Sequence, residues 1–188
     1  RRLGLAVTNA ESLLASRLSA RTDLTERFSA LTAALNMETP CTRLECFDIS
    51  HTVGEQTVAS CVVFDRDGPL KSAYRRFNIE GITPGDDYVA LAQAVRRRYQ
   101  RIKKGEIPQP DVLFIDGGKG QVAATCEALS ALGMGDVVIV GIAKGPDRRP
   151  GMEDLFRARR NERIILPTSS PARLLIQQLR DEAHRFAV

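Results

Sequence analysis

Two apolar segments that each run into an aspartate constrain the fold of this chain more than any other feature. In LECFDISHT, Asp48 follows the apolar run that begins at Leu44, and in DVLFIDGGKG, Asp116 follows the run 112–115. Asp is depleted in strands and is rarely buried without a partner, so an acid at the end of a core strand is either paired or holds a ligand. The matched placement of Asp48 and Asp116 predicts that the two carboxylates meet in space.

Each acid also has an ordinary structural interpretation, in which it caps a turn. Asp116 would then accept hydrogen bonds from the amides of the GGKGQ loop, Gly117–Gln121. Two neighbouring carboxylates repel each other, however, and without a cation one of them would become neutral. A divalent ion removes that repulsion, and Mg²⁺ is commonly held by one or two carboxylates plus water and substrate phosphate. We therefore expect Asp48 and Asp116 to share a divalent ion.

Hydrophobic periodicity and turn residues predict the other elements of the chain. A helix is expected over residues 3–36, with a candidate break at Thr22-Asp23 and an end at Asn36. Strands are expected at 43–49, 57–65, 70–79, 112–115 and 136–142, with weaker strand-like pieces at 154–157 and 163–166. Further helices are expected from Asp86, as a capping residue, to about 104, from about 119 to 132, and from Ser170-Pro171 to about 186.

The order of these elements predicts an α/β fold, with a mixed five-stranded sheet and helices on both faces. The strand at 112–115 follows a helical crossover, so it should lie parallel to an early strand. If that neighbour is the strand at 43–49, both acids end adjacent parallel strands, which is where open α/β sheets bind ligands. Residues 1–40 are expected to form an N-terminal helical arm or linker, and residues 41–188 the domain itself.

Composition narrows the class of protein. The net charge is +4, and between Lys71 and Lys104 nine basic residues stand against three acids. This run favours a polyanionic partner, or equally a solvated helix face. No apolar run approaches the ~18 residues of a membrane span, so no membrane association is expected. The four cysteines include no CxxC pair, which argues against zinc, and three of them in apolar runs (Cys46, Cys61 and Cys126) indicate core thiols in a reducing cytoplasm.

Several basic residues are candidates for binding a phosphate. Lys119 begins a helix, where the helix dipole disfavours a cation unless it faces an anion such as a phosphate; otherwise it is an exposed lysine in a glycine turn. Lys144, in GIAKG, repeats the pattern with lower specificity. In the last helix, Arg180 and His184 fall on one polar face at a spacing of four. A histidine there is an ordinary surface residue or, with its pKa near ~6.5, a ligand or proton carrier.

Two acids, Asp86 and Asp87, stand at the start of the helix that follows the PGDDY block. Capping and the helix dipole account comfortably for one of them. The other is expected to lean into the site.

Four sequence blocks, in order, resemble one known family. They are FDISHTVGEQTVASCVVFDRDGPLKSAYRRFNIEGITPGDDY, FIDGGKGQ, GIAKG and SPARLLIQQLRDEAHRFAV. From about Arg43 to Val188 the chain resembles the C-terminal endonuclease half of UvrC, the incision subunit of bacterial nucleotide excision repair. The resemblance implies a ribonuclease H-like fold and incision on the 5′ side of a lesion. It places the catalytic Asp, Asp, His set on Asp48, Asp116 and His184, and a further functional acid on Asp87.

The expected function is therefore a divalent-metal-dependent DNA endonuclease. Asp48, Asp116 and His184 would hold Mg²⁺ or Mn²⁺, with His184 as a ligand or an acid/base. The expected contacts to damaged double-stranded DNA come from Lys119, Arg76, Lys144 and Arg180, with the run 96–104. UvrB, and UvrA indirectly, are the partners that the resemblance implies for the intact protein, whose N-terminal nuclease, UvrB-docking and helix-hairpin-helix regions are expected outside this chain. The alternative is a non-catalytic nucleic-acid-binding module on the same fold.

Overall fold

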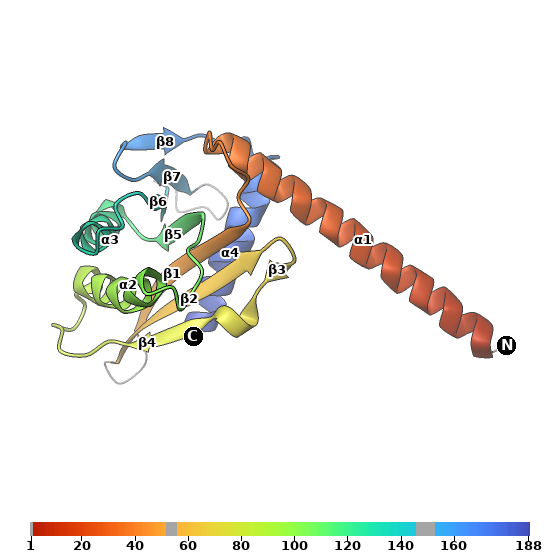
Figure 1. The fold of residues 1–188 in the computed structure, drawn as a ribbon, viewed down its shortest axis with the longest axis horizontal. Helices are drawn as coiled ribbons and strands as arrows, with labels where there is room; N and C mark the ends of the chain where they lie inside the picture. Colours follow the sequence, from red (N-terminus) through yellow and green to blue (C-terminus); the bar gives the residue numbers. More distant parts are fainter. Residues whose placement is uncertain (1, 52–55, 146–152) are drawn as a thin grey trace.

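The computed structural model describes residues 2–51, 56–145 and 153–188, and Figure 1 shows a long helix extending from a layered α/β body. The strands are β1 (Arg43–His51), β2 (Thr57–Asp65), β3 (Gly68–Pro69), β4 (Arg75–Asn78), β5 (Val112–Asp116), β6 (Val138–Ala143), β7 (Asp154–Arg157) and β8 (Glu162–Ile164). The helices are α1 (Arg2–Ala34), α2 (Asp87–Lys103), α3 (Lys119–Ala131) and α4 (Pro171–Ala187), with a 3-10 turn at Lys71–Ala73. No helix in these ranges is both long and apolar enough to cross a membrane.

The strands within the described ranges form one mixed sheet in the order β3-β2-β1-β5-β6-β7-β8, with β4 also paired to β2. β1 is antiparallel to β2 and parallel to β5, as predicted, and β5 is parallel to β6. The register pairs Phe47 of β1 with Ile115 of β5, so Asp48 and Asp116 are the next residues on the two strands. The sheet therefore brings the two acids to the same level.

The sheet differs from the predicted one in the number and length of its strands. It contains eight strands rather than five, because the weak pieces after residue 153 form β7 and β8 beyond β6, and because Gly68–Pro69, outside the expected strands, forms β3 beside β2. The single strand expected at 70–79 is interrupted by the 3-10 turn, in which the amide of Tyr74 donates to the carbonyl of Lys71. The turn brings the Tyr74 ring against Phe186 of α4, with ring centroids 5.1 Å apart.

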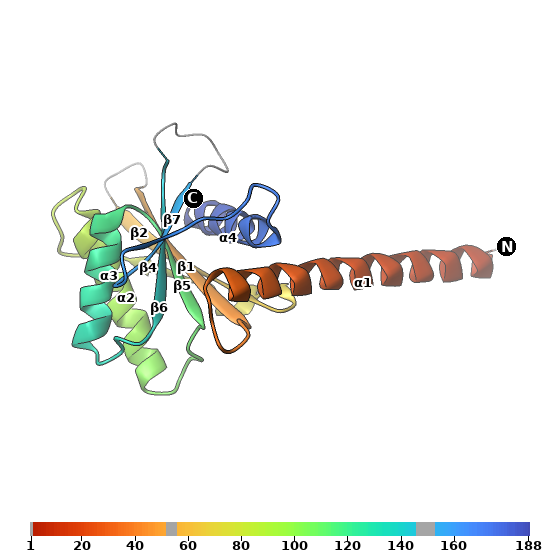
Figure 2. The ribbon, with the colours of Figure 1, turned by 90° about the horizontal axis from the view of Figure 1, so that it is seen from above.

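Helices cover both faces of the sheet, as predicted (Figure 2). On one face α2 and α3 pack against the side chains of Phe47, Leu113 and Ile115. On the other face α4 and the C-terminal end of α1 pack against alternating residues of the same strands, such as Cys46 and Phe114. Because successive strand residues point to opposite faces, the even-numbered Asp48 and Asp116 face α4.

The helix α1 is continuous, so the predicted break at Thr22-Asp23 is wrong. The Thr22 hydroxyl donates to the carbonyl of Leu18 within the helix, which keeps the residue compatible with helical geometry. The helix ends as predicted near Asn36, which has a left-handed φ of 50°. Side chains 4–23 are exposed, whereas Phe28, Leu31 and Leu35 belong to the core. The division at residues 40 and 41 stays a prediction.

One member of the basic run lies in the core. Arg98 of α2 is buried and donates from Nε and Nη2 to the carboxylate of Glu45 on β1, at 2.6–3.0 Å. The prediction that the whole run 96–104 faces DNA is therefore wrong at Arg98. Among the thiols, Cys46 and Cys61 are buried as predicted, but Cys126 is only partly buried.

Candidate functional site

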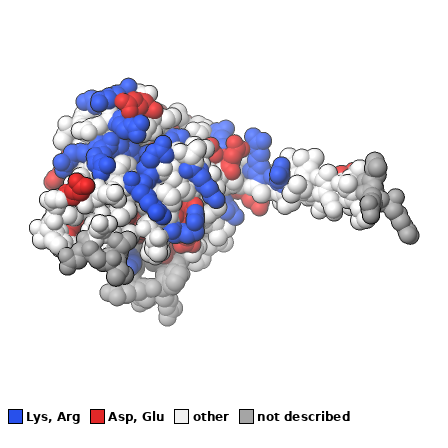
Figure 3. Space-filling view, turned by 90° about the horizontal axis from the view of Figure 1, so that it is seen from below, with Lys and Arg blue, Asp and Glu red and all other residues white. Residues whose placement is uncertain are grey.

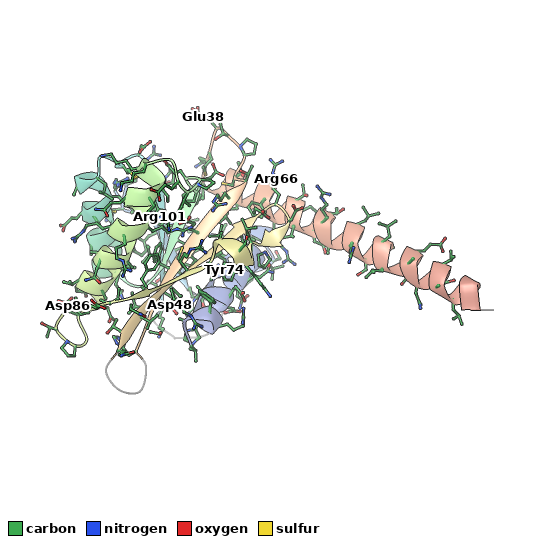
Figure 4. All side chains as sticks on the ribbon, turned by 60° about the horizontal axis from the view of Figure 1, so that its bottom comes forward. Glu38, Asp48, Arg66, Tyr74, Asp86 and Arg101 are labelled. Atoms are coloured by element: carbon green, nitrogen blue, oxygen red, sulfur yellow. The ribbon has the colours of Figure 1, made fainter. Side chains whose placement is uncertain are left out.

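The two predicted acids line one cavity of about 770 Å³ on the α4 side of the sheet. Asp48 lies within β1, opposite Ser60 of β2, so it does not cap a turn. Figure 4 shows Asp48 near the far end of β1 from Glu38, which precedes that strand. Asp116 is the last residue of β5. The cavity is also lined by Gly117, Gly118, Lys144, Arg180, Asp181 and His184.

Helix α4 gives each acid a basic partner. The Nδ1 atom of His184 lies 3.2 Å from Oδ2 of Asp48, and Nε of Arg180 lies 3.3 Å from both carboxylate oxygens of Asp116. Arg180 and His184 are four residues apart, so they lie on one face of the helix as predicted. Arg180 also donates from Nη1 to the carboxylate of Glu153.

The two acids influence each other electrostatically. Burial and then the negative charge of Asp116 raise the pKa of Asp48, while the hydrogen bond with His184 opposes the shift. Burial lowers the pKa of Arg180, but the charges of Asp116 and Glu153 outweigh it, so the net pKa is raised. Arg180 is therefore a permanent cation, and Asp48 bears a charge that its surroundings disfavour.

Two serines hold the last turn of α4 against the sheet. The hydroxyl of Ser60 on β2 donates to the carbonyl of Ala183, and that of Ser50 on β1 donates to the carbonyl of Ala187, both at 3.0 Å. The carbonyl of Ala187, at the end of the helix, has no partner within it, so the Ser50 hydroxyl satisfies a group that would otherwise need water, and the Ser60 hydroxyl adds a second contact to the helix. They place the turn that carries His184 directly over Asp48.

Arg76 of β4 contacts the same turn of α4. Its Nε and Nη2 donate to the carbonyl of Phe186 at 2.9 and 2.6 Å, and its guanidinium lies 4.7 Å from the centroid of the Phe186 ring. The resemblance gave no hint of this contact, and a strand arginine in a basic run gave no signal for it. Binding of DNA by Arg76 stays a prediction, and the contacts that the structure gives it are to α4.

The first two amides of the GGKGQ loop have partners other than Asp116. The amide of Gly117 donates to the carbonyl of Ile142 at 3.1 Å, and that of Gly118 donates to Oε1 of Gln121 at 2.7 Å. A Cβ atom on Gly117 would lie 2.5 Å from Oε1 of Gln121, so a larger residue there would displace the Gln121 side chain that bonds Gly118. These two amides therefore do not bond Asp116, as the turn-capping alternative required. Lys119, at the start of α3, is exposed and outside the residues that line the cavity.

Asp87 lies away from the cavity, on the α2 side of the sheet. Its Oδ1 lies 2.8 Å from Nε2 of His51, whose Nδ1 lies 3.3 Å from the hydroxyl of Thr57. Asp86 caps α2 as predicted, accepting from the amide of Val89. The structure thus brings together Asp48, Asp116, His184, Arg180 and Lys144, and it leaves Asp87, Lys119 and Arg76 outside the cavity.

The donor types in the cavity suit a divalent ion, but one contact stands in the way. Two carboxylates and an imidazole are ligands that Mn²⁺ and, through the carboxylates, Mg²⁺ accept. In residues 2–51, 56–145 and 153–188, no three His, Cys, Asp or Glu side chains are grouped so that they could hold a metal ion. Asp116 has Arg180 as its partner instead. Glu153 was not predicted; its one sequence signal is an acid just before a weak strand.

Comparison with known proteins shows which family the chain is similar to. The family model described as UvrC RNAse H endonuclease domain matches residues 32–188. The chain is 60% identical over 188 residues to UvrABC system protein C of Methylococcus capsulatus, covering 100% of this chain and 31% of that protein. It is 58% identical over 184 residues to that of Ectopseudomonas mendocina, covering 98% and 30%. The chain thus spans about 30% of the length of these relatives.

Solved structures show a more distant similarity. The catalytic domain of human endonuclease V aligns with a TM-score of 0.43 and 18% identity, over 72% of this chain and 59% of that one. An Aquifex aeolicus Argonaute aligns with a TM-score of 0.41 and 17% identity, over 63% and 17%. The family match covers the sheet, the cavity and all of α4. The chain belongs to the family of UvrC RNase H endonuclease domains.

Proposed function

We propose that this domain is the divalent-metal-dependent endonuclease that cuts DNA on the 5′ side of a lesion during nucleotide excision repair. The observation that carries the proposal is the pair Asp48 and Asp116, which lie on adjacent parallel strands and line one cavity with His184. Membership of the UvrC family supports this activity over the alternative of a non-catalytic binding module. Residues 41–188 would form the catalytic unit, with residues 1–40 as its arm.

Asp48, Asp116 and His184 are the residues that would hold the ion, Mg²⁺ or Mn²⁺. When bound, the ion polarises a phosphate and lowers the pKa of water. The protein's own part is to orient these groups. The charged Asp48 accepts a hydrogen bond from Nδ1 of His184, so the other ring nitrogen, Nε2, is the one left for an ion or a proton. The His184 side chain is 72% exposed, which leaves it accessible to a substrate.

Damaged double-stranded DNA is the proposed substrate, bound through its backbone. Figure 3 shows many lysine and arginine side chains on the side of the body where β4 and α2 lie in Figure 1. Lys144 lines the cavity, where it would contact a phosphate beside the scissile bond, and exposed Lys119 would contact the backbone further away. Such contacts are independent of sequence and weaken with salt, which suits an enzyme directed by damage. Asp87 is the further acid that the resemblance implies, and it would act from outside the cavity, where it contacts His51.

The intact protein would work in the bacterial cytoplasm with UvrB, and with UvrA indirectly. The test is therefore incision of a lesion-containing duplex by the full-length protein with these partners. Asp48→Ala and Asp116→Ala should each abolish the 5′ cut while DNA binding survives. Asp136→Ala removes an exposed acid just before β6 and serves as the matched control. Undiminished 5′ cutting by either cavity variant would refute the proposal.

The same assay distinguishes an endonuclease from the binding-module alternative. That alternative draws support from the contact of Asp116 with Arg180, which shows that the acids have partners within the protein. A binding module should show no Mn²⁺-dependent cleavage and no change on loss of Asp48. An endonuclease should lose all cleavage when the metal is chelated and regain it when Mn²⁺ is restored.

A further inference from the structure

Arg180 is a cation that the fold itself supplies to the acid cavity. Its Nε lies 3.3 Å from both oxygens of Asp116, and its Nη1 donates to Glu153. The side chains of Arg180, Asp116 and Glu153 are only 21%, 15% and 13% exposed. An ion pair that is largely removed from water is screened less than a surface pair. The attraction between Arg180 and Asp116 is therefore stronger than that of an exposed pair.

The guanidinium is shared between two acids that have different positions. Asp116 ends β5 and lies at the level of Asp48 on the adjacent strand β1, whereas Glu153 immediately precedes β7, on the far side of β6. A guanidinium carries several N–H donors in a planar fork, so it can give up one acceptor and keep the other. A divalent ion bound to Asp48 and Asp116 would use the oxygens that Arg180 now contacts, and it would repel the arginine charge.

We propose that Arg180 is the internal counter-cation of this site, which competes with the divalent ion for Asp116, and that Glu153 is positioned to hold the guanidinium once the ion is bound. The inference rests on the proposed function in one respect, namely that the ion binds at Asp48 and Asp116. It adds that the apo site is kept neutralised by α4, so that Arg180 weakens ion binding and Glu153 strengthens it. Because coupling between ligands is reciprocal, the ion must equally weaken the contact of Arg180 with Asp116.

The first test is the affinity of the full chain for Mn²⁺ alone, without DNA, measured from the electron paramagnetic resonance signal of free Mn²⁺. Arg180→Gln removes the competing charge and keeps hydrogen-bonding groups, so binding should tighten by about tenfold, within the usual range of such couplings. Arg185→Gln is the matched control, since it removes an arginine of the same helix that pairs with Glu182 and does not line the cavity. Equal tightening in both variants, or none in Arg180→Gln, would overturn the inference.

The second test separates Glu153 as a holder of Arg180 from Glu153 as a nearby negative charge. Glu153→Gln should weaken Mn²⁺ binding. Of its two carboxylate partners Arg180 then keeps Asp116, and it competes with the ion for that carboxylate more strongly. In the Arg180→Gln background the same substitution should have little effect, if Glu153 acts through Arg180. A loss of affinity that is equal in both backgrounds would show a direct charge effect and would contradict the proposed role of Glu153.

The wild-type chain provides a third test that does not depend on a variant folding. On titration with Mg²⁺, the Nε–H resonance of Arg180 should shift in nuclear magnetic resonance spectra, and that of Arg185 should not. An unmoved Arg180 signal at saturating Mg²⁺ would overturn the inference. Asp116→Asn separates this failure from failure of the proposed function: if that variant still binds Mn²⁺ like the wild type, the ion site itself is elsewhere.

Discussion

The imidazole Nδ1 of His184 lies 3.2 Å from Oδ2 of Asp48, although the two residues are 136 positions apart in the chain. Asp48 lies on the strand between β2 and β5, and His184 lies on the last helix. The contact forms only when α4 is seated on the completed sheet, with its final carbonyls bonded by Ser50 and Ser60. Folding of the whole domain is therefore a condition for assembling the site.

The buried charge of Asp48 should make the metal-free protein less stable at neutral pH. Because burial and Asp116 raise its pKa above the ordinary value of 3.8, the folded state binds more protons than the unfolded state between pH 3.8 and the raised pKa. The free energy of unfolding must then fall as the pH rises through that window, and it stays reduced above it. Asp48→Asn removes this loss, so the variant should exceed the wild type in stability at pH 7 and lose that advantage below pH 3.8.

The measurement is urea unfolding in the presence of a chelator, repeated from acid to neutral pH. Asp116→Asn is the instructive comparison, because it weakens a contact with a largely buried arginine and should lower stability instead. If the Asp48→Asn variant is less stable than the wild type at pH 7, the contact of Asp48 with His184 outweighs the cost of burying the charge.

The ion pair of Glu45 and Arg98 should be strongly coupled. Both side chains are at most 1% exposed, so removing either partner leaves an uncompensated charge or an unsatisfied donor set in the core. Glu45→Leu or Arg98→Met should each lower the free energy of unfolding by about 3–5 kcal/mol, as is usual for a broken buried pair. The combined replacement of both by apolar residues should recover much of the loss.

Denaturant unfolding of the two single variants and the double variant gives the coupling energy directly. Arg101→Ala is a matched control from the same helix, because its partner Glu106 is exposed and the pair contributes little. Additive losses in the double variant would mean that the two side chains do not act as a pair.

The sequence predicts the positions of Asp48 and Asp116, but it does not predict most of the residues that surround them. Apolar runs that end in acids, joined by a helical crossover, predict the parallel neighbours β1 and β5 because strand period and crossover rules are local and general. His184 on a face with Arg180 looks like any solvated helix face, so only the family resemblance singled it out. Which of 27 lysines and arginines reaches Glu45, Asp116 or Phe186 depends on tertiary packing, and no spacing rule encodes it.

Arg76 should affect catalysis through α4 more than through DNA. Its contacts with the carbonyl and ring of Phe186 hold the turn next to His184. In the full-length protein, Arg76→Ala should lower the incision rate while the affinity for DNA and its salt dependence change little.

Lys144 provides the contrasting variant, since it lines the cavity and contact with phosphate is the role proposed for it. Lys144→Ala should weaken DNA binding irrespective of sequence and reduce the slope of log affinity against log salt by about 1. If Arg76→Ala reduced that slope by the same amount, Arg76 would be a DNA contact as the sequence predicted.

The arm should divide energetically inside α1, before the predicted boundary at residue 40. Side chains 4–23 are exposed, so their loss removes almost no buried apolar surface, and a chain that begins at Leu24 should keep nearly the same midpoint of thermal unfolding. Phe28, Leu31 and Leu35 are at most 4% exposed and pack in the core with α4. Extending the deletion through residue 36 exposes their binding surface, at a cost of about 1.5–3 kcal/mol for each side chain. Equal stability of the two truncated chains would place the N-terminal boundary of the domain after residue 40, as predicted. A large difference would place that boundary within α1.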